Sequence, residues 1–377
     1  MNVMAANTLP RRLLLELLLV MLFWPASLTA GTAQPGLLKS EFIFDPNPVP
    51  SCHASTIVEA RDKTFVAAWF AGSAEGRPDV SIWSARCIDG KWTAPVKVAE
   101  GVQPNGKRFP CYNPVLFQPR TGPLLLFYKV GPGPGAWWGM LKTSDDNGKT
   151  WSGAGRLPDG ILGPIKNKPV QLADGTILCG SSLEALKAPP IWQIHFERST
   201  NNGRTWNFIT VPQPANSPPA IQPSILFLGG DRLVAVGRTQ VGKIFSTTSD
   251  DNGLSWSKLA LLDLPNPNSG TDAVTLKDGR QLLVYNHTPH GRSPLNLAVS
   301  RDGKTWSAAL VLEDEPGNEF SYPAIIQTCD GLVHITYTWK RKLIKHVVID
   351  PAKLVTRPII NGQWPEQGRP RPSDSLQ

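Results

Sequence analysis

The eight-residue phrase Ser144-Asp-Asp-Asn-Gly-Lys-Thr-Trp151 recurs further along the chain, and this recurrence is the strongest indication of the fold. Copies begin at Ser199 and Ser249, and a copy one residue shorter begins at Ser300. Their tryptophans lie 50 to 55 residues apart, at Trp151, Trp206, Trp256 and Trp306. Asn and Asp bond back to their own backbone in turns and Gly accepts positive φ, so each copy predicts a tight hairpin with its Trp packed beneath it. We therefore expect these repeats to stabilise the structure and not to contact a substrate.

A second repeat, out of phase with the first, gives the number of structural units. Six times a polar residue, often followed by proline, opens an apolar run, a turn and a second apolar run. The openings lie at His53, Asn113, Lys168, Gln222, Asp272 and Tyr322. A period of about 50 residues that carries β-hairpins is typical of a propeller. The sequence thus predicts an all-β fold, a six-bladed β-propeller, whose six opening residues converge at one end of the central channel.

Both chain ends fall outside the repeats. Arg11 and Arg12 precede an apolar run, and small residues follow it, in the order of a secretory signal peptide. An uncleaved membrane anchor is the alternative. The C-terminal stretch is Pro-rich, polar and poor in apolar residues, which predicts a disordered tail. We expect a secreted protein with a signal peptide at 1–33, a propeller at 34–356 and a tail at 357–377.

The two ends of the propeller are expected to meet in one blade, with Glu41 to Phe44 beside Leu343 to Asp350, because closure removes exposed sheet edges. The five cysteines show no metal-ligand spacing, so we expect neither a metal site nor a cofactor. In a secreted chain Cys52 and Cys111 are the natural candidates for a disulfide. Buried unpaired thiols are the alternative.

The net charge of +8 is not concentrated in a basic run with interleaved aromatic residues. Nucleic-acid binding is therefore not expected, nor is membrane contact beyond the signal segment. A basic balance fits an acidic partner, here an acidic glycan. We expect the chain to act as a monomer.

The eight-residue phrases resemble Asp-box (BNR) repeats, and about residues 40 to 350 resemble the sialidase superfamily of six-bladed propellers. In that family three arginines grip the carboxylate of the substrate. A tyrosine activated by a glutamate attacks the anomeric carbon, and an aspartate on a mobile loop serves as acid and base. The tyrosine nucleophile is a departure from the usual carboxylate pair of glycosidases. The resemblance implies that Tyr322 is the nucleophile and that Arg238 and Arg292 are two of the three arginines.

Two positions depart from the pattern of the family. His53 stands where the first arginine is expected, so the carboxylate clamp is incomplete. Gln222 stands where the glutamate beside the tyrosine is expected, and an amide can hydrogen-bond a phenol but cannot take its proton. The loop from Trp69 to Val80 matches the acid/base loop in place, with Glu75 as our first choice for the acid/base residue and Asp79 as the alternative.

These patterns give two sets of candidate residues. The catalytic candidates are Tyr322, Glu75, Asp79 and Gln222. The substrate-binding candidates are His53, Arg77, Asn113, Lys129, Lys168, Arg238, Asp272 and Arg292.

The first functional hypothesis is a secreted, sialidase-like exo-glycoside hydrolase that acts on an acidic sugar, a sialic or a uronic acid. The second is a lyase of uronate polysaccharides, in which His53 and Tyr322 form the base and acid pair. The third is a non-catalytic glycan-binding propeller, which the loss of the glutamate favours.

Overall fold

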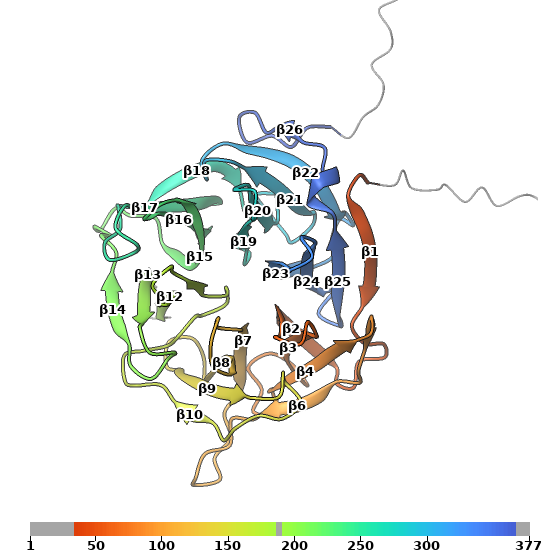
Figure 1. The fold of residues 1–377 in the computed structure, drawn as a ribbon, viewed down its shortest axis with the longest axis vertical. Helices are drawn as coiled ribbons and strands as arrows, with labels where there is room; N and C mark the ends of the chain where they lie inside the picture. The colour runs from red at the N-terminus through yellow and green to blue at the C-terminus, as the bar shows by residue number, and fades with distance from the viewer. Residues whose placement is uncertain (1–33, 186–190, 367–377) are drawn as a thin grey trace, which may run out of the picture. The chain divides into compact units, whose positions relative to one another are not determined.

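The computed structural model describes residues 34–185 and 191–366. These residues form six antiparallel sheets arranged around a central axis (Figure 1), so the prediction of an all-β, six-bladed propeller is confirmed. The expected signal peptide, residues 1–33, lies outside the described residues. Within the described ranges no helix has the length and apolarity needed to span a membrane.

Each blade places one strand beside the axis and steps outward from it (Figure 1). Blade 1 contains β2 (Ser51–Glu59), β3 (Phe65–Gly72), β4 (Ser81–Ile88), β5 (Lys91–Trp92) and β6 (Val96–Ala99). Blade 2 contains β7 (Cys111–Phe117), β8 (Leu124–Val130), β9 (Trp138–Ser144) and β10 (Gly155–Arg156). Blade 3 contains β11 (Val170–Gln171), β12 (Ile177–Ala185), β13 (Ile191–Ser199) and β14 (Asn207–Thr210).

The second half of the ring repeats this plan. Blade 4 contains β15 (Ala220–Gly229), β16 (Arg232–Thr239), β17 (Lys243–Ser249) and β18 (Ala260–Pro265). Blade 5 contains β19 (Asp272–Thr275), β20 (Gln281–Tyr285), β21 (Leu295–Ser300), β22 (Trp306–Glu313) and β26 (Arg357–Pro358). Blade 6 contains β23 (Phe320–Gln327), β24 (Val333–Trp339), β25 (Leu343–Ile349) and β1 (Leu37–Phe42), and the 3-10 helix η1 (Pro351–Lys353) follows β25.

The inner strands of four blades have a residue in the left-handed conformation near their start. Ala54, Asn113, Gln222 and Tyr322 have φ angles of 55°, 40°, 58° and 51°. At each of them the pairing with the next strand shifts register, as at a β-bulge. Proline follows three of the four. Since bulges re-aim side chains and are frequent beside active sites, the repeated polar-Pro phrase marks the bulge at the start of an inner strand.

The structure corrects the alignment of blade 1 by one residue. The sequence repeat makes His53 the equivalent of Asn113 and Tyr322, whereas Ala54 occupies the left-handed position and His53 precedes it. Blade 1 has Ser55 where the three other blades have proline, so its sequence carries no marker for the register.

The eight-residue phrases form the predicted hairpins and connect neighbouring blades. In the copy that begins at Ser249, the Asp251 carboxylate accepts hydrogen bonds from the backbone and hydroxyl of Ser255, at 2.9 and 2.5 Å. Trp256 at the end of this phrase stacks on Phe196 of blade 3, with ring centroids 3.8 Å apart. These contacts make the phrase a structural device, because it fixes a turn and packs one blade on the next.

β1 closes the ring by pairing with β25, as the sequence predicts. Glu41 of β1 lies opposite His346 in this pairing. Its carboxylate accepts hydrogen bonds from His346 Nδ1 at 3.0 Å and from Trp92 Nε1 of blade 1 at 3.2 Å. The closing strand is therefore bonded both to its own blade and to the first one.

The C-terminal segment differs from the expected tail at 357–377. Arg357–Pro358 forms β26, which pairs with β22 of blade 5. Ile359 and Trp364 then pack against the core of blades 4 and 5. These apolar contacts hold a segment whose Pro-rich composition predicts disorder. Within the expected tail, residues 357–366 are described and residues 367–377 are not.

The expected disulfide between Cys52 and Cys111 does not form. All five cysteines are unpaired, and both of these are buried. Burial raises the pKa of each thiol to about 12. The alternative, buried thiols acting as small apolar side chains, describes them correctly.

The stability of the closure should depend on pH through His334, whose Nδ1 lies 2.9 Å from His346 Nε2. Burial, and next the charge of His346, lower the pKa of His334 to about 4. The folded state therefore binds fewer protons than the unfolded state between about pH 6.5 and 4. We expect the free energy of unfolding to fall across this window, with His334 contributing up to about 1.4 kcal/mol per pH unit.

Chemical denaturation at a series of pH values tests this prediction. The His334→Gln variant should show a shallower loss of stability below pH 6.5 than the native chain. His290→Gln reports the effect of removing an exposed histidine. Equal slopes in the native chain and the His334 variant would contradict the prediction.

Candidate active site

Tyr322, at the start of the inner strand β23, is surrounded by basic side chains. Arg238 Nη2 donates a hydrogen bond to the phenol oxygen at 2.9 Å. The charged groups of Arg292 and Lys166 lie 5.6 and 5.7 Å from the centroid of the tyrosine ring. The His53 ring centroid lies 4.2 Å from the same point. We call these five residues the tyrosine cluster.

The residues of the tyrosine cluster come from different blades, so the ring must close before the cluster exists. Arg238 ends β16 of blade 4, and Arg292 lies between β20 and β21 of blade 5. Asn286, which is fully buried, donates hydrogen bonds to the carbonyl oxygens of Arg292, Pro294 and Phe320, at 2.9 to 3.0 Å. This buried amide thereby ties the loop that carries Arg292 to the strand that carries Tyr322.

Gly270 leaves the space that Lys166 and Tyr322 fill. A Cβ at this position would lie 2.9 Å from Lys166 Cε and 3.2 Å from Tyr322 Cδ2. Lys166 Nζ donates to the carbonyl oxygens of Thr271 and Pro323, at 2.9 and 2.6 Å. Burial lowers the pKa of Lys166 to about 7, so the charge of this ammonium changes near neutral pH.

A third arginine, which the repeats do not predict, reaches the cluster from the turn between β24 and β25. Arg341 Nε and Arg292 Nη1 both donate to Glu319 Oε1, at 2.8 and 2.7 Å. Arg341 Nη1 also donates to Glu75 Oε2 at 2.5 Å. The Glu319 carboxylate thus aligns Arg292 and Arg341. Through its bond to Arg341, Glu75 of the expected acid/base loop is connected to the cluster.

His53 is buried and faces several cations. Burial, and then the charges of Arg341, Arg292 and the other nearby cations, hold the pKa of His53 well below its usual range. The imidazole is therefore neutral near pH 7. Its Nδ1 lies 3.0 Å from Thr338 Oγ1, and this hydrogen bond fixes the orientation of the ring.

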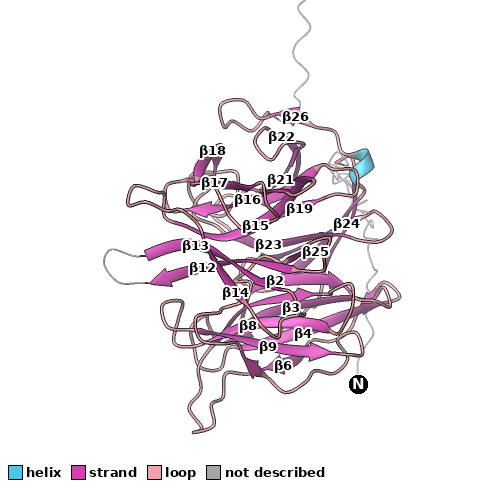
Figure 2. Cartoon of the chain, turned by 60° about the vertical axis from the view of Figure 1, so that its left-hand side comes forward, coloured by secondary structure: helices cyan, strands magenta, loops and turns pink. Residues whose placement is uncertain are grey.

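Glu184 is a buried carboxylate beside Arg238 that the sequence analysis does not identify. It lies opposite Trp192 in the β12–β13 hairpin, whose two strands run side by side in Figure 2. The guanidinium carbon of Arg238 lies 5.2 Å from the Trp192 ring centroid. Burial raises the pKa of Glu184, against the charge of Arg238 and hydrogen bonding with Gln222. Arg238 therefore has Tyr322 as one partner and the hairpin that carries Glu184 as another.

The loop after β3 holds its two candidate carboxylates differently. Asp79 accepts hydrogen bonds from the backbone and hydroxyl of Ser73, at 2.7 and 2.8 Å. Against the opposing effect of burial, these bonds hold the pKa of Asp79 below its usual value. Asp79 thus closes the loop, while Glu75 contacts Arg341. Arg77 is exposed, and no ion pair of its side chain is present among the described residues.

Four further candidates lie in the interior. Lys168 Nζ and Asp272 Oδ2 form an ion pair of 3.0 Å. Asn113 is buried at the bulge of β7. Lys129 Nζ donates to Pro164 O at 2.7 Å, and burial lowers its pKa to about 7. Lys129 and Asp272 are at most 1% exposed, and the contacts that the structure gives them are with other parts of the protein.

The six blades, the Asp-box hairpins and the cluster of arginines around a tyrosine define a sialidase-like propeller. The family model described as BNR repeat-like domain matches residues 63–335, and the chain belongs to this family. The comparison with curated proteins finds no match.

Solved structures share the fold at low sequence identity. The NanB sialidase from Streptococcus pneumoniae is 13% identical with a TM-score of 0.66, over 84% of this chain and 71% of that one. The intramolecular trans-sialidase from Ruminococcus gnavus is 14% identical with a TM-score of 0.67, over 84% and 98%. A protein of unknown function from Dyadobacter fermentans is 19% identical with a TM-score of 0.69, over 86% and 100%. These likenesses show the fold, and the reaction must be argued from the site.

Replacing Arg341 tests the electrostatics of the cluster without any ligand. Among the charges that lower the pKa of His53, that of Arg341 acts most strongly. Arg341→Met keeps the aliphatic stem and removes the charge, so the pKa of His53 should rise while burial still holds it below its usual value. An NMR titration of the histidine ring measures this shift, with Arg86→Met, outside the cluster, as control. An unchanged His53 titration in Arg341→Met would contradict the assignment.

Proposed function

We propose that the protein is a glycoside hydrolase that acts on an acidic sugar, a sialic or a uronic acid, at the tyrosine cluster. The observation that carries the proposal is the hydrogen bond from Arg238 to the phenol oxygen of Tyr322 within a group of arginines. Cations that are oriented before the ligand arrives stabilise an anionic ligand without the cost of reorganisation. The basic balance of the chain supports the same class of substrate.

The carboxylate of the sugar would be held by arginines. Arg292 and Arg341 share the oxygen of Glu319, so their guanidinium groups are aligned and leave other N–H groups for a ligand. Charge-assisted hydrogen bonds from guanidinium to carboxylate are among the strong ones in proteins. Arg341 would thus be the third arginine that binds the carboxylate, since His53 stands where the family has an arginine. This third arginine comes from the turn between β24 and β25.

Tyr322 would act as the nucleophile. As its O–H proton passes to the neutral imidazole of His53, the phenol oxygen forms the bond to the anomeric carbon while the glycosidic carbon–oxygen bond breaks, and the leaving oxygen takes a proton from Glu75. Water then attacks the anomeric carbon as its bond to Tyr322 breaks; Glu75 accepts a proton from that water, and the phenol oxygen recovers its proton from His53. The hydrogen bond from Arg238 stabilises the negative charge that develops on the phenol oxygen.

Glu184 would compensate for the glutamine at position 222. Burial raises its pKa, against the charge of Arg238 and hydrogen bonding with Gln222. Arg238 in turn donates the hydrogen bond to the phenol oxygen of Tyr322. We assign Glu184 as a positioning residue, whose charge orients Arg238 toward Tyr322.

A uronate lyase is the second candidate, because a neutral His53 lies beside Tyr322, with ring centroids 4.2 Å apart. A neutral imidazole can take the proton next to the uronate carboxylate, while a phenol protonates the leaving oxygen. Incubation with sialosides and uronate polysaccharides distinguishes the candidates. Hydrolysis produces reducing ends alone, whereas elimination also produces an unsaturated sugar that absorbs in the ultraviolet. Binding without either product would identify a non-catalytic glycan-binding propeller.

Tyr322→Phe should abolish hydrolysis while the protein stays folded, because the substitution removes the attacking oxygen and keeps the ring. The expected loss in kcat is at least about 10³-fold, the scale on which removal of a nucleophile acts. Circular dichroism and thermal unfolding control for the fold. Full activity in this variant would exclude Tyr322 as the nucleophile.

Exchanging the carboxylate at position 184 and the amide at position 222 tests the role of Glu184. Glu184→Gln should lower kcat and remove a carboxylate titration from the pH profile of kcat/KM. The double variant Glu184→Gln with Gln222→Glu returns a carboxylate to the site and should recover part of the activity. Glu100→Gln, at the surface, is the matched control. A native pH profile in Glu184→Gln would show that Glu184 has no part in the reaction.

A further inference from the structure

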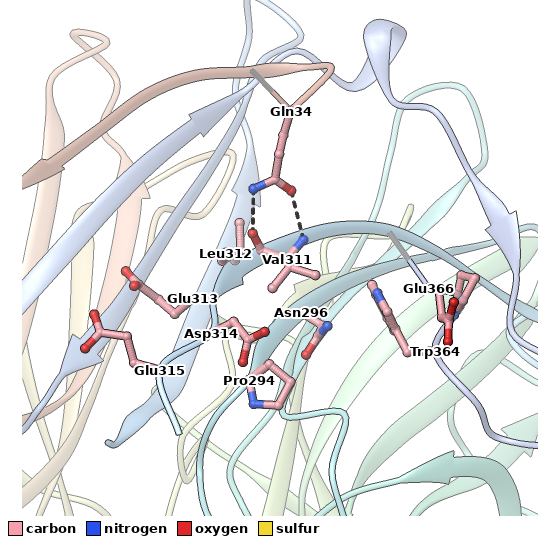
Figure 3. Close-up of a pocket in the computed structure, with 11 residues that line it drawn as sticks. Gln34, Pro294, Asn296, Val311, Leu312, Glu313, Asp314, Glu315, Trp364 and Glu366 are labelled. Atoms are coloured by element: carbon pink, nitrogen blue, oxygen red, sulfur yellow. Dashed lines mark hydrogen bonds between the residues drawn. The ribbon is translucent and has the colours of Figure 1, made fainter. Parts of the chain in front are cut away.

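A pocket that contains none of the residues of the tyrosine cluster lies beside strands β21 and β22 of blade 5 (Figure 3). Its volume is about 640 Å³, within the range of small-molecule sites. Strands β21 and β22, the segment that follows β26, and Gln34 line it. Gln34 fixes one rim, because its side-chain amide donates to Val311 O at 2.7 Å and accepts from Val311 N at 3.0 Å (Figure 3).

Asn296 lines this pocket with an unused hydrogen-bonding group. The residue is 1% exposed. Its Oδ1 is buried without a hydrogen-bond partner among the described residues. A buried polar atom that lacks a partner costs roughly 1 to 3 kcal/mol. Figure 3 shows the Asn296 amide among the residues around the pocket, where a ligand can supply the missing donor.

The pocket is acidic in a chain whose net charge is +8. Glu313 and Glu315 on its wall are paired with Lys345 and Lys340. Asp314 between them forms no ion pair within the described part of the chain. Glu366, at the other side of the lining, also forms no ion pair among the described residues, so Asp314 and Glu366 are the carboxylates whose charge is left for a ligand.

Trp364 gives the pocket an aromatic wall. Its ring is half-buried and packs edge-on against His287, with centroids 5.1 Å apart. An aromatic ring attracts a cation or the apolar face of a sugar. Among the described residues no group of three or more acidic, histidine or cysteine side chains is placed to hold a metal ion. The lining thus fits an organic cation better than a metal.

We propose that this pocket binds a protonated amino sugar, with the ammonium against Asp314, a hydroxyl donating to Asn296 Oδ1 and the ring against Trp364. The segments that form the pocket also carry the tyrosine cluster and its partner, since Pro294 follows Arg292 by two residues and Glu315 precedes Glu319 by four. A glycan chain that presents an acidic sugar to the cluster therefore has an amino-sugar subsite nearby. Binding at the pocket does not depend on turnover at the tyrosine cluster.

Calorimetric titration of the full chain with a glucosamine tetrasaccharide tests the proposal, with the fully N-acetylated tetrasaccharide as the uncharged control. We expect the glucosamine form to bind, and the acetylated form to bind at least about tenfold more weakly, because one charge-assisted hydrogen bond is worth that factor. Asp314→Asn should weaken binding by a similar factor. Asp159→Asn, an exposed carboxylate outside the pocket, should leave it unchanged.

Further variants separate this site from the proposed active site. Tyr322→Phe should bind the glucosamine tetrasaccharide as the native chain does. Asn296→Leu should weaken binding, and its melting temperature reports whether the fold is intact. Equal affinity for the charged and acetylated sugars, native affinity in Asp314→Asn, or no binding of the charged sugar would each overturn the proposal.

Discussion

The carboxylate of Asp272 holds several blades together at the axis. Oδ1 accepts hydrogen bonds from Ser224 Oγ of blade 4 and from the backbone N of Ala273, at 3.0 and 2.9 Å. Oδ2 accepts from Lys168 Nζ and from the backbone N of Ile325 in blade 6, at 3.0 and 2.9 Å. Burying a carboxylate is costly unless each oxygen is paired. Here the pairing requires blades 4, 5 and 6 and the segment before β11 at once, so the cluster around Tyr322 depends on a closed ring.

The bulges on the inner strands connect this ring to the site. Non-glycine residues at positive φ are uncommon, and they persist where the surrounding structure fixes them. Tyr322 and Gln222 both occupy such positions, in the strands that start blades 6 and 4. The sequence predicts these positions well, because proline follows each of them and the period repeats. The same regularity predicts the fold and the place of Tyr322, whereas Arg238 and Arg292 are predicted only through the resemblance to the sialidase family.

Residues outside the repeats could not be predicted from the period. Arg341 lies in a turn, Glu319 in a loop and Glu184 near the end of a hairpin strand. Their roles arise from contacts across the ring, and nothing local marks them. The one-residue error in the predicted alignment of His53 has a local cause. Blade 1 has Ser55 where the three other blades with this bulge have proline, so nothing in its sequence marks the register. The anchoring of the C-terminal segment depends on Ile359 and Trp364, two apolar residues in a stretch of disordered composition.

The substitution of histidine for arginine at the axis has an electrostatic explanation. A buried position that already faces Arg238, Arg292, Arg341 and Lys166 is unfavourable for another fixed charge, because like charges repel strongly where water is excluded. Histidine fills the space beside Tyr322 and stays neutral. Arg341 brings the positive charge from the rim, where its side chain is 31% exposed and two carboxylates balance it. Tyr322 and His53 thereby have three arginines around them, of which only Arg238 is buried, and this exposure of the other two lowers the cost of holding like charges together.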